Sequence, residues 1–362
     1  MILFTIVIFV ALLAALILLH EWGHFFVARK SGIRVDEFGI GFPPKAFSVK
    51  YGGTEYSVNW VPLGGFVKIH GEDGDVGAGD PDSFGAKPLW VRMGVILAGV
   101  GMNFLTAIVL LSFGFWYGLP QVVDENVPYA VRDVKVTVLQ VAPNSPAEHA
   151  GIKIGDAVKQ IRAGAVETAI EDTKTLQDTV AAHKGEEIVV VLTRGKEIME
   201  KKITPRKETL EGQGPLGVVI DKTGIVSYPW YLAPVEGVKT TFSLGWLFLS
   251  TFGTVMWGLF THGKMIADIS GPVGIGALTY QVTQLGFSYV IQFAAIISLN
   301  LAIINALPIP ALDGGRFLFL LIEGIKGSPV SQRYEKVAHA VGFMVLIALM
   351  IAVTVRDVMK LF

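Results

Sequence analysis

The sequence reads Leu16-Ile-Leu-Leu-His20-Glu-Trp-Gly-His24 at the point where its first long apolar run, residues 1–19, meets two histidines and a glutamate. On a helix, His20 and His24 share one face, so both imidazoles can bind one metal ion while Glu21 polarises a water molecule beside them. Such groups are costly at the end of a membrane-spanning helix and indicate a function there. The alternative is a set of polar residues that face the lipid headgroups.

The composition of the 362 residues indicates a membrane protein. Hydrophobic residues make up 52% of the chain and charged residues 17%, and the mean hydropathy is +0.54. Soluble globular proteins carry about 25% charged residues. The net charge of -1 gives no basis for a nucleic-acid partner. Since the sequence contains no cysteine, disulfides and cysteine-ligated metal sites are excluded.

Four apolar runs approach or exceed the ~20 residues that cross the hydrocarbon core of a membrane. They predict transmembrane helices within residues 1–29, 88–118, 285–316 and 335–356. The first run lacks a basic start and a small-residue cleavage site, so we expect a retained helix rather than a secretory signal peptide. The expected fold class is a polytopic α-helical membrane protein with four transmembrane helices.

Lysines and arginines predict the orientation of these helices. They are frequent between the first two helices and between the last two, so both segments are expected in the cytoplasm and the N-terminus outside. The active site then lies toward the cytoplasmic side. A fifth apolar run, residues 242–260, would place the last loop on the wrong side if it crossed. We therefore expect residues 228–284 to form an interfacial, amphipathic segment, which suits Trp246 and Trp257.

Residues 124–222 hold nearly half of all charged residues and predict a small α+β domain inserted between membrane helices, outside the membrane. Residues 134–138 alternate apolar and polar side chains, as a half-buried strand does. Residues 188–203 predict a hairpin with its turn at Arg194-Gly-Lys196. Residues 175–183 predict a short amphipathic helix.

Residues 33–70 predict a β-hairpin, although they lie between two membrane helices. Residues 56–60 alternate, Gly52-Gly53 and Gly64-Gly65 punctuate the segment, and Pro43-Pro44 excludes a helix. Lipid tolerates strand backbone only where protein or a cavity satisfies its hydrogen bonds. We therefore expect a membrane-associated hairpin whose edge gains a partner, and a substrate peptide would be a suitable one.

A catalytic zinc site needs a third protein ligand and an open fourth position. Asp313 is the candidate, because prolines end the third helix and Gly314-Gly315 would let the backbone turn tightly and aim the carboxylate inward. Taken alone, an aspartate that caps a helix start and pairs with Arg316 would be the simpler interpretation. His339 lies inside the last apolar run and is interpreted as a packed or pore-lining side chain.

Three motifs together resemble the bacterial site-2 proteases, which are intramembrane zinc metalloproteases of regulated intramembrane proteolysis. The motifs are HEWGH at residues 20–24, Leu63-Gly-Gly-Phe-Val-Lys68, and Asn305-Ala-Leu-Pro-Ile-Pro-Ala-Leu-Asp-Gly-Gly315. The resemblance covers essentially the whole chain. It implies a Zn²⁺ ion held by His20, His24 and Asp313, with Glu21 as the catalytic base.

The resemblance also implies a set of residues that bind the unwound substrate. These residues are Asn103, Asn300, Asn305, Gly64, Gly65 and Phe66. The hairpin around residues 38–66 corresponds to the family's membrane-dipping β-element. The second helix carries Gly99-Val-Gly-Met-Asn103 where the family has Gly-Pro-x-x-Asn, so the proline associated with a local kink is missing.

The inserted domain is similar to a single PDZ domain of the bacterial form, through residues 138–147 and 150–156. Some members of the family carry two such domains in tandem. A PDZ groove would bind the C-terminus of an extended peptide by adding a strand. The alternative is a spacer or size filter that binds no peptide.

The expected function is hydrolysis of peptide bonds within transmembrane segments of single-span proteins in the bacterial cytoplasmic membrane. Anti-sigma factors and remnant signal peptides are the substrate classes that the resemblance implies. One alternative is an inactive membrane scaffold that binds partners through its PDZ-like domain, against which the intact Glu21 argues. The other is a transporter, but the hydropathy shows no inverted repeat.

Overall fold

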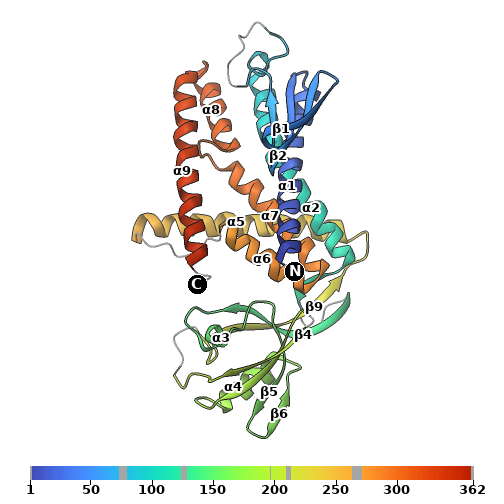
Figure 1. Ribbon diagram of the computed structural model, residues 1–362, viewed down its shortest axis with the longest axis vertical. Helices are drawn as coiled ribbons and strands as arrows, with labels where there is room; N and C mark the ends of the chain where they lie inside the picture. Colours follow the sequence, from blue (N-terminus) through green and yellow to red (C-terminus); the bar gives the residue numbers. More distant parts are fainter. Residues whose placement is uncertain are drawn as a thin grey trace. The chain divides into compact units, whose positions relative to one another are not determined.

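The computed structural model describes residues 2–72, 80–123, 129–195, 197–208, 213–262 and 271–359. These residues form two compact units (Figure 1). The first unit comprises Met1–Leu111, Glu236–Tyr280 and Phe293–Phe362, and the second comprises Ser112–Val235 and Gln281–Gln292. The predicted start of the inserted domain at residue 124, and Lys196 of the predicted turn, lie outside the described residues.

Four helices in the described part of the chain are long and apolar enough to cross a membrane, as the sequence predicted. They are α1 (Ile2–Lys30), α2 (Leu89–Tyr117), α7 (Phe287–Ala306) and α9 (Gln332–Met359). Helices that are apolar on all sides are typical of membrane spans. A shorter helix, α8 (Asp313–Lys326), follows α7 after a loop and ends at Gly327, which adopts the left-handed conformation.

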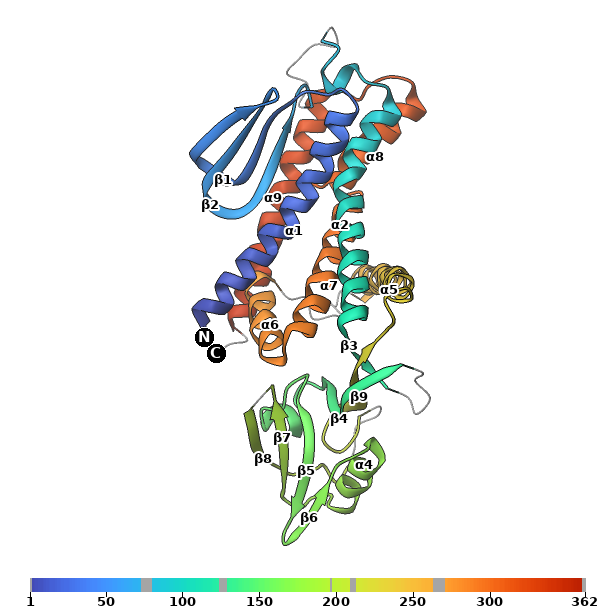
Figure 2. The same cartoon turned by 90° about the vertical axis from the view of Figure 1, so that its right-hand side faces the viewer.

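Helix α5 (Ala233–His262) contains the fifth apolar run and is not among these four helices. It runs across the direction of α1 and α9 (Figures 1 and 2). Trp246 and Trp257 are largely exposed on its surface. The next helix, α6 (Pro272–Leu285), is joined to α9 by Asp357, whose Oδ2 atom accepts hydrogen bonds from the N–H groups of Gly271 and Gly274, both at 2.8 Å.

Residues 33–70 contain a hairpin of two long strands, β1 (Val35–Tyr51) and β2 (Thr54–Ile69). Gly52 and Gly53 form its turn with φ angles of 57° and 84°, which glycine adopts freely. The second glycine pair, Gly64-Gly65, lies inside β2 rather than at a turn.

The hairpin is folded back on itself and lies beside the C-terminal half of α1 (Figure 2). Residues 37–40 of β1 pair with residues 65–68 and also with residues 55–58 of β2. Each strand therefore contributes two short segments. Among the described residues, the segment 61–69 pairs with β1 on one side only, so it forms an edge of this small sheet.

The second unit is built on a seven-stranded sheet with the order β3-β9-β4-β5-β7-β8, and β6 pairs with β5. The strands are β3 (Leu119–Val122), β4 (Ala130–Val141), β5 (Ala157–Ala163), β6 (Val166–Ala169), β7 (Ile188–Arg194), β8 (Glu197–Ile203) and β9 (Val218–Ser227). The helices are α3 (Pro146–His149) and α4 (Thr173–Ala182).

The core of this unit follows from the alternating pattern of its strands. Val136 and Val138 of β4 are buried together with Ile161 of β5 and Leu192 of β7, and Leu176 of α4 packs into the same cluster. Strands β7 and β8 form the predicted hairpin. The sheet extends beyond the predicted limits of 124–222, because β3 pairs with the end of β9.

Candidate metal centre

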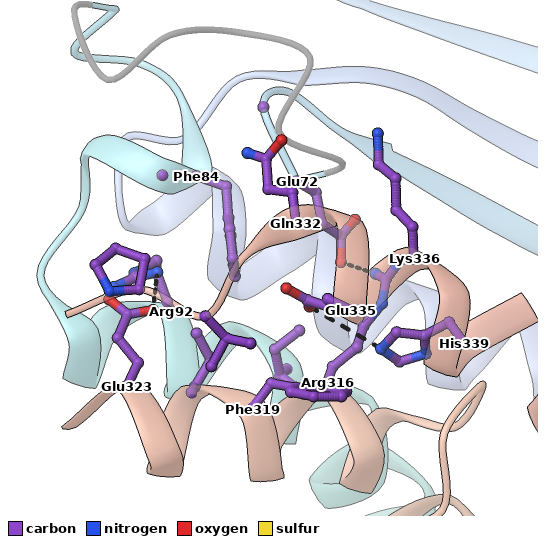
Figure 3. Close-up of a pocket in the computed structure, with 16 residues that line it drawn as sticks. Glu72, Phe84, Arg92, Arg316, Phe319, Glu323, Gln332, Glu335, Lys336 and His339 are labelled. Atoms are coloured by element: carbon purple, nitrogen blue, oxygen red, sulfur yellow. Dashed lines mark hydrogen bonds and ion pairs between the residues drawn. The ribbon is translucent and has the colours of Figure 1, made fainter. Parts of the chain in front are cut away.

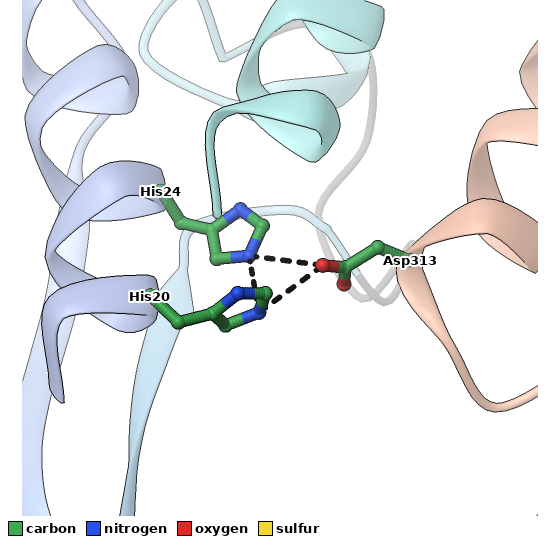
Figure 4. Close-up of side chains that lie close together, drawn as sticks. All are labelled: His20, His24 and Asp313. Carbon is green, nitrogen blue, oxygen red and sulfur yellow. Dashed lines mark hydrogen bonds and ion pairs between the residues drawn. The ribbon is translucent and has the colours of Figure 1, made fainter. Parts of the chain in front are cut away.

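Three side chains converge where α1 meets the start of α8 (Figure 4). The Oδ2 atom of Asp313 lies 3.1 Å from Nε2 of His20 and 3.3 Å from Nε2 of His24, and the two Nε2 atoms are 3.2 Å apart. Both histidines are buried, with exposed fractions of 7% and 8%. The structure thus brings together the three residues that the sequence offered as metal ligands.

The triangle of donor atoms has the dimensions of one face of a tetrahedral zinc site. Zinc binds imidazole nitrogen and carboxylate oxygen at about 2.0–2.2 Å, so the ligand atoms of a tetrahedral site are about 3.3 Å apart. Three lone-pair atoms at this spacing repel one another unless a proton or a cation lies among them. Three protein ligands and an open fourth position are typical of catalytic zinc, so the residues present fit the metal.

Helix α2 fixes the orientation of both imidazoles. The Nδ1 atom of His24 donates to the carbonyl oxygen of Val95 at 2.8 Å, and Nδ1 of His20 faces the side-chain amide of Asn103 at 3.3 Å. The Val95 carbonyl keeps the ring proton of His24 on Nδ1 and leaves its Nε2 lone pair for a metal.

The Asn103 amide is completely buried, and its orientation follows from this chemistry. A His20 ring that offers its Nε2 lone pair to a metal carries its proton on Nδ1 and needs an acceptor there, so the Oδ1 atom of Asn103 belongs at the contact. With Nδ2 in that place, Oδ1 is buried without a hydrogen-bond partner among the described residues. Asn103 therefore lies against the His20 ring, and its contact with substrate stays a prediction.

Two glycines let α1 and α2 cross closely at the centre. A Cβ atom on Gly23 would lie 2.4 Å from the carbonyl oxygen of Ala98, and one on Gly99 would lie 2.2 Å from Nε2 of His24. The roles of Gly99 and Val95 at this centre were not predicted from the sequence. Their signal was the four-residue spacing of Val95, Gly99 and Asn103, which places all three on one face of a helix.

Asp313 is the first residue of α8. Gly314 and Gly315 are helical, so the prediction of a tight glycine turn is wrong. The position requires glycine for a steric reason, since a Cβ atom on Gly314 would lie 2.1 Å from the carbonyl oxygen of Leu307. The backbone turns instead at Ala311, whose φ angle is 82°.

The simpler interpretation of Asp313 as a helix cap is also wrong. The N-cap position of α8 is occupied by Leu312, which makes no side-chain capping bond. Arg316 forms an ion pair with Glu72 rather than with Asp313. The Asp313 carboxylate points instead toward the two imidazoles of α1 (Figure 4).

A cavity of about 240 Å³ opens onto these side chains. Glu21, Asn103 and Asn305 line it together with the apolar side chains of Ile17 and Leu301. The cavity therefore combines a carboxylate, two amides and an apolar wall within reach of the metal ligands. Asn300, which lies one residue before Leu301 on α7, is not among the lining residues.

The edge segment 61–69 of the hairpin passes beside the HEWGH motif. A Cβ atom on Gly65 would lie 2.9 Å from Cδ2 of Leu18 and 3.7 Å from Cγ of Glu21. Gly64 has a φ angle of 88°, which favours glycine. The ring of Phe66 covers Gly39 on the neighbouring strand. At both glycines the hairpin edge therefore lies beside α1 as bare backbone, next to Ile17 and Glu21.

Comparison with known proteins gives matches along nearly the whole chain. The family model described as Peptidase family M50 matches residues 8–349. The chain is similar to the zinc metalloprotease RasP of Geobacillus kaustophilus, at 30% identity in an alignment that covers 99% of this chain and 98% of the relative. It is also similar to the regulator of sigma-W protease RasP of Bacillus subtilis, at 29% identity in an alignment that covers 99% of each chain.

Proposed function

The chain belongs to peptidase family M50 and is a zinc metalloprotease of the site-2 type, and we propose that it hydrolyses peptide bonds within the transmembrane segments of single-span membrane proteins. The observation that carries the proposal is the triangle of His20, His24 and Asp313, in which both histidines lie beside Glu21 on α1, a helix long enough to span a membrane. A substrate that lies in the bilayer reaches such a site without leaving the bilayer.

The proposed mechanism assigns one task to each polar group of the cavity. His20, His24 and Asp313 hold the zinc ion, which when bound polarises the scissile carbonyl and lowers the pKa of a water molecule to about 7. The Glu21 carboxylate accepts a proton from the attacking water and donates it to the nitrogen of the leaving amine as the C–N bond breaks. Asn103 holds the ring of His20 in its metal-binding orientation.

Substrate binding requires a local loss of helix. A helical substrate hides its carbonyl groups in i→i−4 hydrogen bonds, so the segment at the active site must unwind. The hairpin edge of residues 61–69 offers backbone groups beside Glu21 and can add the extended segment as a strand. Gly64 and Gly65 allow a close approach, and Asn305 supplies hydrogen bonds that the unwound segment has lost.

We expect cleavage to depend on how easily the substrate helix unwinds. Two Leu→Gly substitutions near the scissile bond weaken a helix by about 2 kcal/mol, so they should raise the cleavage rate by roughly tenfold or more where unwinding limits it. Rates are measured with purified protein and a model single-span substrate in liposomes. The same substitutions outside the span serve as the control, and equal rates for all these substrates would contradict the unwinding step.

We place the protein in the bacterial cytoplasmic membrane, with the N-terminus and the second unit outside and the active site toward the cytoplasm. The distribution of lysine and arginine supports this orientation. Helix α5 is placed in the membrane interface, because it runs across α1 and α9 and exposes Trp246 and Trp257 (Figure 1).

The orientation can be tested directly, because the sequence contains no cysteine. A membrane-impermeant maleimide should label Lys202→Cys in the second unit of intact spheroplasts. It should label Ser331→Cys, at the start of the last membrane helix, only after the membrane is permeabilised. Both positions are exposed. Labelling of Ser331→Cys from outside would reverse the proposed topology.

The Bacillus subtilis relative carries the name regulator of sigma-W protease, which favours a membrane-bound anti-sigma factor as the substrate class, with remnant signal peptides as the second class. The second unit is proposed to be a single PDZ-like domain. It either captures a peptide C-terminus or excludes substrates with large external parts. Stepwise shortening of the external part of a substrate separates these roles, because only a size filter responds to length alone.

The proposed activity is tested by reconstituting the purified protein with a model single-span substrate. We expect cleavage inside the span, mapped by mass spectrometry, that is lost when zinc is removed by a chelator and restored when zinc is returned. A wild-type protein that binds no zinc would instead support the inactive scaffold.

A further inference from the structure

The last membrane helix, α9, touches the loop that presents Asp313. The Nδ1 atom of His339 accepts a hydrogen bond from the backbone N–H of Ala311 at 2.8 Å. Three residues further along α9, a Cβ atom on Gly342 would lie only 2.3 Å from the carbonyl oxygen of Pro310. Helix α9 therefore contacts two consecutive residues of the loop between α7 and α8.

This loop contains a backbone conformation that needs support. Ala311 has a φ angle of 82°, in the left-handed region that a residue with a Cβ atom rarely adopts. Such a residue keeps this conformation only where its surroundings hold it there. Because Ala311 lies two residues before Asp313, a change in its φ angle would rotate the start of α8 and carry the carboxylate away from His20 and His24.

The imidazole of His339 is itself held in place (Figure 3). Its ring packs against Phe319 of α8, with 5.6 Å between the ring centroids. Its Nε2 atom lies 4.0 Å from a carboxylate oxygen of Glu335, one helical turn earlier on α9. An imidazole that accepts at Nδ1 carries its proton on Nε2, and Glu335 lies on that side. His339 is therefore oriented to accept the Ala311 N–H.

We propose that His339 is a positioning residue for the metal ligand Asp313. By accepting the N–H of Ala311, it holds the loop in the conformation that directs the Asp313 carboxylate toward the histidines of α1. This inference rests on the proposed function, in which Asp313 binds zinc. It assigns to α9 a part in zinc affinity, where the sequence suggested only a packed or pore-lining histidine.

Zinc affinity is the measurement that tests this role. The full-length protein, purified and reconstituted, is titrated with a competing chelator of known affinity. His339→Leu keeps a similar volume but removes the acceptor, and we expect it to lower zinc affinity by about 10- to 100-fold. His339→Asn keeps an acceptor oxygen near the position of Nδ1 and should stay within about threefold of wild type. Met344→Leu, on an exposed part of α9, is the matched control and should not change the affinity.

A second variant separates loop positioning from general damage to α9. Glycine adopts a positive φ angle freely, so adding Ala311→Gly to His339→Leu should recover part of the lost zinc affinity. A loss caused by poor helix packing would not respond to this change.

The inference is overturned if His339→Leu binds zinc as wild type does, if His339→Asn loses as much affinity as His339→Leu, or if Ala311→Gly restores none of it. In those cases wild-type zinc binding and cleavage leave the proposed function intact. A wild-type protein that binds no zinc would overturn both proposals together.

Discussion

Glu21→Gln protein is expected to bind zinc as wild type does and to cleave its substrate about 10²- to 10⁴-fold more slowly. This is the range that general acid–base catalysis contributes. The three donor atoms that fit a zinc ion come from His20, His24 and Asp313, so the metal site does not depend on the Glu21 carboxylate. Glutamine has nearly the same shape, but its amide cannot accept and return a proton. The substitution therefore separates metal binding from proton transfer.

The experiment measures bound zinc and cleavage in the same reconstituted samples. Trp22→Phe is a suitable control, because Trp22 neighbours Glu21 on α1 but is 44% exposed and does not belong to the donor triangle. This control should keep both zinc and activity. If Glu21→Gln retained activity within about tenfold of wild type, another group would have to transfer the proton. If it lost zinc as well, Glu21 would have a structural part in the metal site.

The sequence was most informative where local geometry alone decides the outcome. Two histidines four residues apart on a helix must share a face, so the HEWGH motif predicted two converging imidazoles without any knowledge of tertiary structure. Helix length and apolar character likewise predicted the four candidate membrane helices. The distant partner, Asp313, came from its motif and from the family resemblance, and the structure brings it to the two histidines.

Features that depend on contacts between distant segments were not predictable in the same way. The carbonyl oxygen of Val95 accepts from His24, but a backbone group has no signature in the sequence. The sequence predicts a tight turn at Gly314 and Gly315. Both glycines are helical instead, and they are required because a Cβ atom at either position would collide with the preceding loop. The double pairing of residues 37–40 depends on bends in both strands, which alternation of side chains does not reveal.

Gly99→Ala is expected to reduce zinc affinity by about 10- to 100-fold or more, because the added methyl group points at the metal site itself. A Cβ atom at this position would lie 2.2 Å from Nε2 of His24 and 2.7 Å from Cε1 of His20. If the rings rotate away, the donor triangle is lost. If α2 moves away instead, the hydrogen bond from His24 to Val95 and the contact of His20 with Asn103 are broken.

Gly101→Ala on the same helix isolates this effect. Apart from the neighbouring backbone of α2 itself, no atom of the described residues lies within 4 Å of a Cβ atom built at Gly101, so its methyl group has open space. Both substitutions gain the same helix propensity, about 0.5–1 kcal/mol, so any difference between them reports the contact with the imidazoles. We expect Gly101→Ala to keep wild-type zinc affinity and to unfold at a slightly higher temperature. Equal zinc affinity for the two variants would show that α2 can recede without disturbing the histidines, and α2 would then not orient the metal ligands.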